Sequence, residues 1–496
     1  MQLRAKNLAI ATGNPKIALI NYIDALKHDL HYADRMRIRK GKKETIAMID
    51  IADSNDLVLP GEIGLFEEVH QKLSIKDKDI LNIYIEDKPK SIHYIKKKLK
   101  GEKLTEHEIK TIIKDIIEDR LTEVELTYFV ASTYVHELND DETVALTKAM
   151  ISLGQTFKLK NKVVLDKHCI GGVAGNRTTM IVVPIIAAAG LYIPKTSSRS
   201  ITSAAGTSDT VEVLCDVSFS LEKMGKIVKK TGGCLVWGGA VNLAPADDKI
   251  IKVEHPVSLD PVGGLIASIL AKKKSVSATH VLIDIPVGRS AKTQSKKRAE
   301  LLKGKFERVS KRLGMKTKVL ITNGSQPIGN GIGPALEARD VLWTLSRSPK
   351  GADDLKKKSI ILAGELFDLS GKTKKGKGKL LAKEILESGK AYEKFIEIIK
   401  AQNAKILFPE QIEVGRYKSH ILASKKGIVT HVDNKRINRI AKLAGAPHDA
   451  QSGLYLYVHK KSKVKKGDRL YTIYSNNKDR LAFAKQFAKT YKAIEF

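Results

Sequence analysis

The pattern that most constrains the fold is a buried strand, a glycine-rich loop and a helix, in that order. Residues 163–165 (VVL) form an apolar run, residues 166–177 (DKHCIGGVAGNR) form the loop, and residues 178–189 have helical character. A second unit of this kind starts at residues 191–193 (LYI). Strands that alternate with helices predict a largely parallel sheet with its ligands at the carboxyl ends of the strands.

The segments around these units differ in pattern. Residues 281–285 and 318–322 indicate further buried strands, each followed by a helical pattern. The region 1–85 is β-rich, with short apolar runs between turn signals, and a capping box at Thr105–Glu108 begins a helical block. From about residue 416 the pattern indicates a separate α+β unit.

Length and residue types restrict the protein class. The 496 residues, 42% of them hydrophobic, predict three or four units with sizeable cores. We expect no membrane span, because no window holds eighteen uncharged apolar residues, and no secretory signal, because MQLRAKNLAI lacks an apolar core. Three cysteines without metal-ligand spacing and scattered histidines without zinc spacing favour a cytoplasmic chain that binds no metal.

The charge is strongly positive. Lysine and arginine number 87 against 55 acidic residues, a formal net charge of +32. A field of this sign attracts polyanions and small phosphorylated substrates alike. The lysines are scattered along the chain, which is also typical of a solvated surface, and only 5% of residues are aromatic. We therefore expect an anion-binding protein and no nucleic acid partner.

The first loop has the chemistry of a phosphate cradle. Its three glycines allow the backbone to approach a ligand closely, and the helix that follows offers free N–H groups to an anion. Lys167, Arg177, Thr178 and Thr179 add cations and hydroxyl donors, and of these Lys167 and Thr179 are candidate phosphate-binding residues. An ordinary turn with a charged flank is the alternative interpretation.

The second loop, residues 195–207, also follows a strand and precedes a helix. Seven of its residues are serine or threonine and one is Arg199. Hydroxyl and guanidinium groups suit phosphate and ribose oxygens, which makes Ser197 a further candidate phosphate-binding residue. A flexible polar surface loop is the alternative, and it is less attractive when two such loops leave one edge of a sheet.

A third segment, residues 253–261 (VEHPVSLDP), holds three titratable side chains. Ser268 follows eight residues after Asp260, and Lys272–Lys274 come next. A carboxyl group at Asp260 would serve as a general acid if burial raises its pKa. Considered alone, an aspartate before a proline is more often a helix cap or a turn residue.

Several motifs in one consistent order resemble the thymidine/pyrimidine nucleoside phosphorylase superfamily. The shared forms are DKHCIGGV, SSRSITSAAGTSDTVEVL and VNLAPADD. Longer forms resemble its AMP phosphorylase branch: CIGGVAGNRTTMIVVPI, PKTSSRSITS, VEHPVSLDP, IDIPVGRSAK and IGPALEARD. These motifs cover most of residues 86–496, and residues 1–85 resemble the extra N-terminal domain of that branch.

This resemblance implies a multidomain α/β fold. The expected parts are an N-terminal β-rich domain (1–85), a helical domain (86–160 plus 250–280), a central α/β phosphate-binding domain with a mostly parallel sheet (161–249 plus 281–415) and a C-terminal α+β domain (416–496). The active site is expected between the helical and α/β domains. The superfamily also implies a homodimer or a higher homo-oligomer.

The resemblance assigns roles to single residues. Lys167 matches the phosphate-contacting lysine and Asp260 the proposed proton donor. The matches to nucleotide-binding positions are Gly172, Ser198, Arg199, Ser200, Ile201, Thr202, Ser203, Thr207, Ser268 and Lys292. The base-reading arginine of thymidine phosphorylases is replaced by Val253, which favours a nucleotide over a pyrimidine nucleoside.

The activity implied is phosphorolysis of AMP, with CMP and UMP as expected further substrates, to give the free base and ribose 1,5-bisphosphate in nucleotide salvage. AMP and inorganic phosphate are the expected partners, with no cofactor. A pyrimidine nucleoside phosphorylase is the alternative within the same class. A basic nucleic-acid-binding protein is the alternative from another class, and the charge of +32 keeps it open.

Overall fold

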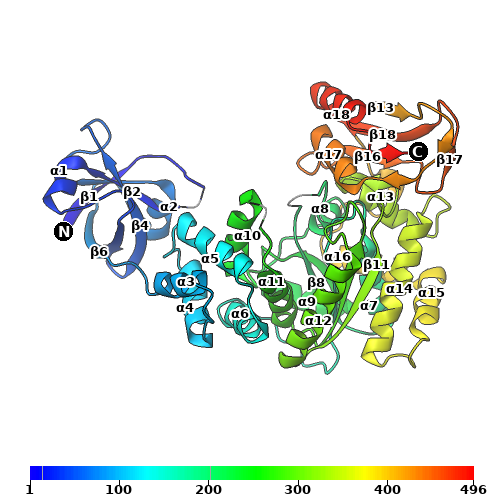
Figure 1. Cartoon of the computed structure of the whole chain (residues 1–496), viewed down its shortest axis with the longest axis horizontal. Helices are drawn as coiled ribbons and strands as arrows, with labels where there is room; N and C mark the ends of the chain where they lie inside the picture. Colours follow the sequence, from blue (N-terminus) through cyan, green and yellow to red (C-terminus); the bar gives the residue numbers. More distant parts are fainter. Residues whose placement is uncertain (14, 201–202, 258) are drawn as a thin grey trace. The chain divides into compact units, whose positions relative to one another are not determined.

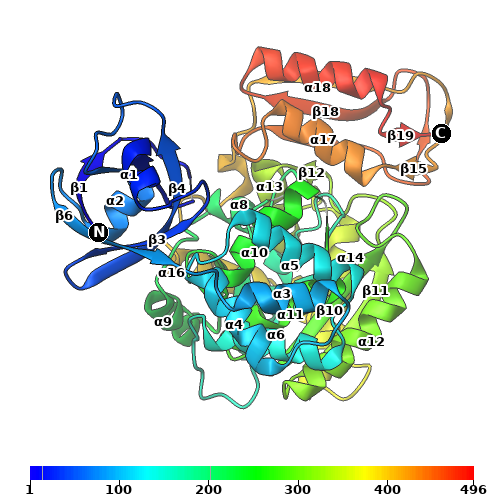
Figure 2. The ribbon, with the colours of Figure 1, turned by 60° about the vertical axis from the view of Figure 1, so that its left-hand side comes forward.

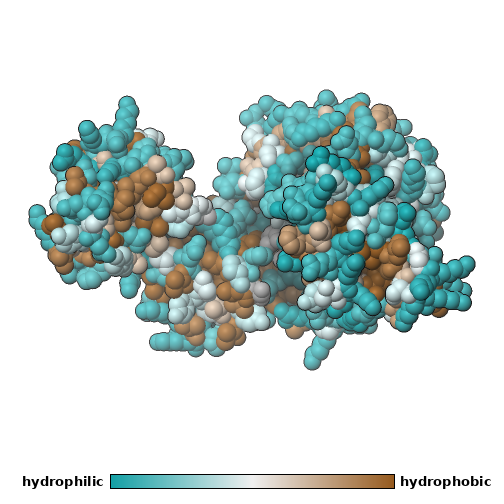
Figure 3. Space-filling view, turned by 90° about the horizontal axis from the view of Figure 1, so that it is seen from above, coloured by the Kyte–Doolittle hydropathy of each residue, from teal (hydrophilic) through white to brown (hydrophobic). Residues whose placement is uncertain are grey.

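The computed structural model describes residues 1–496 except 14, 201–202 and 258. The chain forms two compact units. The first comprises Met1–Ala149 and Ala246–Gly264, and the second comprises Met150–Pro245 and Leu265–Phe496. Figure 1 colours the chain from its N-terminus in blue to its C-terminus in red. Hydrophilic side chains cover most of the face in Figure 3, in keeping with a composition that is 29% charged.

The β-rich N-terminal region is a closed six-stranded barrel in the order β1-β5-β2-β4-β3-β6. Short helices α1 (Tyr22–Lys27) and α2 (Glu67–Leu73) accompany it. Alternate side chains such as Ile20, Met36 and Ile49 fill the interior, as expected when every second residue of a strand faces inward. The strands are β1 (Gln2–Asn7), β2 (Ile17–Asn21), β3 (Arg35–Lys40), β4 (Lys43–Ala52), β5 (Glu62–Leu65) and β6 (Ile80–Glu86).

A helical part completes the first unit. The predicted capping box is present: the Thr105 hydroxyl accepts from the Glu108 N–H, and the Glu108 carboxylate accepts from the Thr105 N–H at 2.8 Å. A second capping box at Thr122 and Glu125 begins a helix that the sequence analysis did not identify. The helices are α3 (Ser91–Leu99), α4 (Glu106–Ile117), α5 (Glu123–Val135), α6 (Asp140–Ser152) and α10 (Pro245–Val257).

The second unit contains five parallel strands. Strands β11, β10 and β7 form one sheet, strands β8 and β9 form another, and a parallel bridge between Val164 and Tyr192 connects the two. The spatial order is therefore β9-β8-β7-β10-β11. From β7 the chain adds β8 and β9 toward one edge of the sheet and then β10 and β11 toward the other edge, so the strand order reverses between β7 and β10. The strands are β7 (Leu165–Cys169), β8 (Ile193–Ser197), β9 (Gly233–Trp237), β10 (His280–Val287) and β11 (Lys316–Asn323). Ligands bind preferentially at such a reversal, beyond the carboxyl ends of the strands.

Helices surround these strands, and α7 is buried along nearly its whole length. It packs with α14 and α16 in the largest apolar core of the unit. The helices are α7 (Thr178–Ala188), α8 (Thr207–Glu212), α9 (Leu221–Thr231), α11 (Val262–Ser275, beginning in the first unit), α12 (Lys296–Arg312), α13 (Pro334–Leu345), α14 (Asp353–Ser370), α15 (Gly378–Glu387), α16 (Lys390–Ala401) and the short η1 (Pro409–Gln411).

Two strands extend further than their sequence predicted. The predicted loops begin at residues 166 and 195, but β7 continues to Cys169 and β8 to Ser197. Asp166, Lys167 and Lys195 are charged and yet buried within these strands. Their polarity is typical of a loop, and the ion pairs and hydrogen bonds described below account for their burial.

The C-terminal region is an α+β layer, visible at the top of Figure 2. Four strands in the order β12-β16-β18-β13 form its sheet, and α17 and α18 pack on one face of it. The elements are β12 (Gly331–Ile332), β13 (Tyr417–Leu422), β14 (Gly427–Ile428), β15 (His431–Val432), α17 (Asn434–Ala444), β16 (Gly453–Leu456), β17 (Lys463–Val464), β18 (Arg469–Ser475), α18 (Lys478–Thr490) and β19 (Ile494–Glu495). None of the helices in the described part of the chain combines the length and apolarity that crossing a membrane requires.

Candidate active site

Lys167 is fully buried where β7 approaches the end of the sheet. Its Nζ donates to the Thr178 hydroxyl at 3.0 Å and to the Thr179 hydroxyl at 3.4 Å, both in the first turn of α7. Burial lowers the pKa of the Lys167 ammonium, and the charge of Asp284 opposes this effect. A buried ammonium beside a helix N-terminus favours the binding of an anion. Three predicted phosphate-binding features therefore lie together: the Lys167 ammonium, the Thr179 hydroxyl and the N-terminus of α7.

Two buried carboxylates on neighbouring strands pair with buried lysines. Asp166 on β7 pairs with Lys273 (Nζ–Oδ2 2.9 Å) and Lys195 (Nζ–Oδ1 3.8 Å). Asp284 on β10 pairs with Lys358 of α14 (Nζ–Oδ2 2.9 Å) and accepts from the Thr322 hydroxyl at 2.6 Å. The three lysines outnumber the two carboxylates and favour a positive local field, although burial lowers the pKa of Lys195 well below its usual range.

His168 lies within this positive field. Burial lowers its pKa well below the usual range, and Lys273, Lys195 and Lys167 lower it further. Its imidazole is therefore neutral at physiological pH. The Cys169 pKa is raised by burial, so its thiol stays protonated.

The first loop packs tightly against the segment that follows β10. Gly172 has φ +82°, and a Cβ there would lie 2.1 Å from the Lys292 backbone nitrogen. Only glycine permits this approach. Lys292 itself is exposed. Two predicted nucleotide-binding positions, Gly172 and Lys292, are thus adjacent at the point where the strand order reverses.

The C-terminal region holds both loops of the site. Asn434, at the start of α17, is buried and accepts from the Ala174 N–H at 3.0 Å while donating to the Gly324 carbonyl at 3.1 Å. Asn438 on the same helix accepts from the Ala204 N–H at 3.0 Å. Because each acceptor satisfies a loop amide, α17 fixes the backbone of the first and second loops together.

Arg199 in the second loop contacts two carboxylates. It donates to Glu212 at 2.5 and 2.8 Å and to Asp209 at 3.3 Å, and its guanidinium lies 4.8 Å from the centre of the Trp237 ring. The hydrogen bonds that Arg199 donates to Glu212 are the main reason that the pKa of Arg199 is raised. Asp209 also accepts from the N–H groups of Ser200 and Gly206 at 2.7 and 2.8 Å. These bonds define the shape of the loop.

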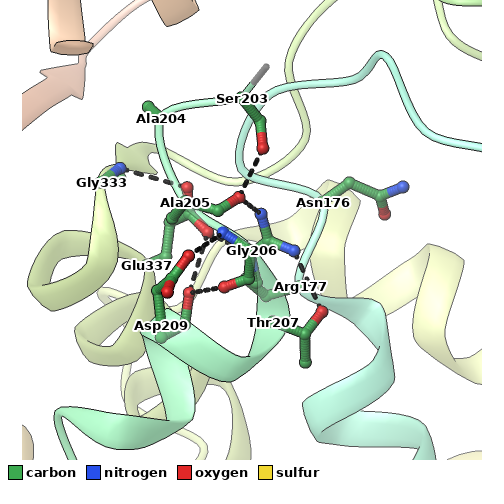
Figure 4. A network of polar contacts seen from close by, with 12 residues as sticks. Asn176, Arg177, Ser203, Ala204, Ala205, Gly206, Thr207, Asp209, Gly333 and Glu337 are labelled. Atoms are coloured by element: carbon green, nitrogen blue, oxygen red, sulfur yellow. Dashed lines mark hydrogen bonds and ion pairs between the residues drawn. The ribbon is translucent and has the colours of Figure 1, made fainter. Parts of the chain in front are cut away.

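Arg177 connects the two loops through a buried network (Figure 4). It pairs with Glu337 of α13 and donates to the Ala205 carbonyl at 2.6 Å and to the Thr207 hydroxyl at 3.2 Å. Glu337 also accepts from the Gly333 N–H at 3.1 Å. Arg177 thus connects the first loop, the second loop and α13.

The other predicted residues lie as follows. Ser197 ends β8 with a buried hydroxyl that has no hydrogen-bond partner within the described residues, and Ser198 is exposed beside it. Ser203 donates to the Ala205 carbonyl at 2.8 Å. Ile201 and Thr202 lie outside the described residues.

Asp260 and Ser268 belong to different units. Asp260 is half-buried two residues before α11, in the first unit, which agrees with the helix-terminus alternative for its position. Ser268 lies within α11 in the second unit and is half-buried. Both retain their predicted candidate roles.

Sequence reasoning did not single out four charged residues of this site: Asp284, Glu337, Lys195 and Lys358. Asp284 had a signal, because a carboxylate interrupts the apolar run VLIDIPV. Glu337 had a similar signal inside the largely apolar helix α13. Lys358 had none, because it follows two other lysines and the sequence does not indicate which of the three faces inward.

Family models match this chain in three consecutive segments. Residues 92–154 match the helical bundle domain of a glycosyl transferase family, and residues 161–392 match its a/b domain. Residues 428–495 match the C-terminal domain of pyrimidine nucleoside phosphorylases. Together with the phosphate-type site, these matches define a glycosyl transferase of the pyrimidine nucleoside phosphorylase class.

Relatives along the full length specify the branch. The chain is 45% identical to an AMP phosphorylase of Pyrococcus furiosus, over 100% of this chain and 98% of the relative. It is 46% identical to an AMP phosphorylase of Thermococcus kodakarensis, over 93% and 92%. The chain belongs to the AMP phosphorylase family. Among solved structures, an anthranilate phosphoribosyltransferase from Thermus thermophilus shares the fold, with a TM-score of 0.54 at 19% identity over 62% of this chain and 98% of that one.

Proposed function

We propose that this chain catalyses the phosphorolysis of AMP to adenine and ribose 1,5-bisphosphate, with CMP and UMP as further substrates. The observation that carries the proposal is the similarity to AMP phosphorylases at about 45% identity along the whole chain. The class of the site agrees, because the buried Lys167 of β7 donates to Thr178 and Thr179 in the first turn of α7, where a helix N-terminus favours an anion.

The electrostatics of the site support two phosphates at once, one as the nucleophile and one as the 5′ group of AMP. The charges of Lys358 and Arg177 act on the buried Lys167 together with that of one carboxylate, Asp284. The surplus of positive charge offsets the repulsion between two bound anions.

In the proposed reaction, phosphate held by Lys167 and Thr179 attacks C1′ of the ribose. The bond between C1′ and the purine nitrogen breaks while a bond between C1′ and a phosphate oxygen forms. The transition state is oxocarbenium-like, and the electron pair of the broken bond leaves with the base. We assign to Asp260 the proton that the base receives, a transfer worth roughly 10²–10⁴ in rate.

The proposed nucleotide-binding positions divide into two groups. Gly172, Lys292 and Ser268 are assigned to direct contact with AMP, together with the serines and threonines of the second loop. Arg199 is assigned to shaping that loop, because its guanidinium already binds Glu212 and Asp209. Lys292, exposed beside Gly172 and matching a nucleotide-binding position of the family, is the candidate cation for the 5′-phosphate.

The test is base release from AMP and from adenosine, each with and without phosphate. Release from AMP that requires phosphate supports the proposal, and ribose 1,5-bisphosphate should accumulate in equal amount. Release from a nucleoside with formation of ribose 1-phosphate would instead favour a nucleoside phosphorylase. No release from either substrate would contradict both.

A further inference from the structure

The C-terminal sheet packs one face against α17 and α18. Its opposite face is covered in part by α13, whose Trp343 lies 6.5 Å from Tyr455 between ring centres. Leu454, Leu456, Tyr471 and Ile473 point to the helices and are buried in the apolar core. Because successive side chains of a strand alternate, the residues between them point to the other face. We call this the outer face of the sheet, and its residues include Tyr455, Thr472, Tyr474, Lys418 and His420.

Aromatic rings and cations alternate across and beside the outer face. Tyr455 lies 5.3 Å from Tyr457, measured between ring centres, and Tyr457 is 42% exposed. The Arg469 guanidinium lies 5.4 Å from the Tyr457 ring, and Arg339 lies 5.6 Å from the Tyr455 ring. The result is a short ladder of rings, each with a cation beside it.

This ladder is fixed in place rather than free to rotate. The Tyr457 hydroxyl lies 3.2 Å from the Thr472 hydroxyl, which lies 2.8 Å from the His420 Nδ1. Asn330 donates to the Tyr455 hydroxyl at 3.3 Å. Rings that are already ordered lose little entropy when a ligand stacks on them.

The edge of the same sheet continues the pattern. Tyr417 on β13 lies between Arg416 at 4.8 Å and Lys478 at 5.4 Å, each measured to the ring centre. A shallow hollow of about 290 Å³ opens beside it, lined also by Lys418 and Lys485. Cations therefore line the route from the outer face across β13.

Charge is concentrated in this region. Residues 416–496 contain 19 lysines and arginines and five acidic residues, a formal charge of +14 out of the chain's +32. The complementary partner is a polyanion. Duplexes offer their phosphates but hide their bases, whereas a single strand offers both, so the combination of the exposed Tyr457 ring with nearby cations favours a single strand.

We propose that the outer face binds a single-stranded nucleic acid, with a base stacked on the exposed Tyr457 and phosphates beside Arg469, Lys418 and the edge strand. Four-stranded sheets with aromatic side chains on an open face recognise single-stranded RNA in this manner. This surface revises the expectation of no nucleic acid partner, which rested on the low overall aromatic content. The proposal goes beyond phosphorolysis of AMP and uses none of the residues assigned to that reaction.

The experiment is fluorescence anisotropy of a labelled twelve-nucleotide oligouridylate with the full-length protein. Tyr457→Ala and Arg469→Ala should each weaken binding about tenfold, since stacking and cation contacts contribute measurably for each base. Raising salt from 50 to 200 mM should weaken binding roughly twentyfold if about three phosphates are contacted. Matched controls are Tyr128→Ala, which removes another exposed tyrosine, and Lys375→Ala, which removes an exposed cation of a distant loop. Both should bind as the parent does.

Three results would overturn the proposal. Equal losses in Tyr457→Ala and Tyr128→Ala would show that the outer face is not the site. If the protein binds a duplex as tightly as the single strand, the surface recognises only the charge of the phosphates. Dissociation of a homo-oligomer by Tyr457→Ala, without loss of oligouridylate binding, would identify a second copy of this chain as the occupant. Base release from AMP should be unchanged in Tyr457→Ala, so a failure here is distinguishable from a failure of the proposed enzymatic function.

Discussion

The ammonium of Lys273 lies 2.9 Å from the carboxylate of Asp166, and both side chains are almost completely shielded from solvent. Lys195 lies 3.8 Å from the same carboxylate on its other oxygen. One buried carboxylate therefore contacts two buried lysines, and burial lowers the pKa of Lys195 well below its usual range. Such pairs contribute little net stability, but the loss of one partner leaves an uncompensated charge.

Replacing Asp166 by alanine should therefore destabilise the second unit by roughly 3–5 kcal/mol. Urea unfolding followed by circular dichroism measures the change. Asp353→Ala, at an exposed position in the first turn of α14, is the control and should stay within about 1 kcal/mol of the parent. A loss for Asp166→Ala no larger than for this control would show that solvent reaches Lys273.

Lys167→Met should separate function from folding. The substitution removes a buried ammonium, so the free energy of unfolding should be unchanged or higher. The value of kcat/KM should fall roughly 10²–10³-fold, with a higher KM for phosphate, because one charge-stabilising donor is lost. Steady-state kinetics at varied phosphate measure this, with the exposed Lys375→Met as control. Unchanged affinity for phosphate would exclude Lys167 from its site.

Asp260→Asn tests the proton donor. The substitution retains size and polarity but removes the acid, so turnover should fall roughly 10²–10⁴-fold. The Kd for AMP, measured by calorimetry without phosphate, should change less than about threefold. Asp353→Asn serves as the control, since this aspartate is exposed. Turnover close to that of the parent would assign the proton to another group.

Gly172→Ala and Gly171→Ala form a matched pair. Both glycines have positive φ, +82° and +96°, so each alanine costs about 1–2 kcal/mol of backbone strain. Only the Gly172 Cβ would meet the Lys292 nitrogen, at 2.1 Å, whereas that of Gly171 meets no atom within 4 Å. Activity on AMP should thus fall at least tenfold further in Gly172→Ala. Similar losses in both variants would mean that strain alone matters.

We expect the free energy of unfolding to depend on pH through Asp340. It is buried in α13, and burial raises its pKa to about 7, although the N–H groups of Gly331 and Asn330 oppose the shift. The folded state therefore holds a proton that the unfolded state releases near pH 4, so this group's stabilisation is complete at low pH and is lost as pH rises toward 7. The whole effect is roughly 4 kcal/mol.

Asp340→Asn removes this titration while preserving an oxygen that accepts from the same amides. The free energy of unfolding of the parent, relative to this variant, should decline between pH 4.5 and pH 7.5. If the free energies of unfolding of the two proteins change in parallel with pH, the pKa of Asp340 is the same in the folded and unfolded states. Arg339 and Asp354, which lower and raise the same pKa, are present in both proteins and cancel in the difference.

The sequence predicted which helices and strands form better than it predicted the residues at which they end. Alternation of strands and helices correctly indicated parallel strands in the second unit, and the capping box at Thr105 was confirmed. The predicted carboxyl ends of β7 and β8 were wrong, because buried charged residues such as Lys167 resemble loop residues until their partners are known. Closure of the N-terminal strands into a barrel depends on pairings such as Gln2 with Asn82, which no local pattern reveals.

The candidate site was only partly predictable for the same reason. Lys167, Gly172 and Thr179 lie in one short motif, and the structure gathers them around the end of β7. Lys358 comes from a run of three lysines that gives no orientation. Arg177 was considered a cation for phosphate, yet its partner Glu337 lies 160 residues away, where spacing carries no information.

The amides of Ala174 and Ala204 find their acceptors in Asn434 and Asn438, which lie 260 and 234 residues later in the chain. During synthesis at about 5–20 residues per second, the loops emerge from the ribosome many seconds before these asparagines exist. The nascent protein therefore carries both loops without their final anchors for that time. We therefore expect both loops to take their final shape only after α17 has been synthesised.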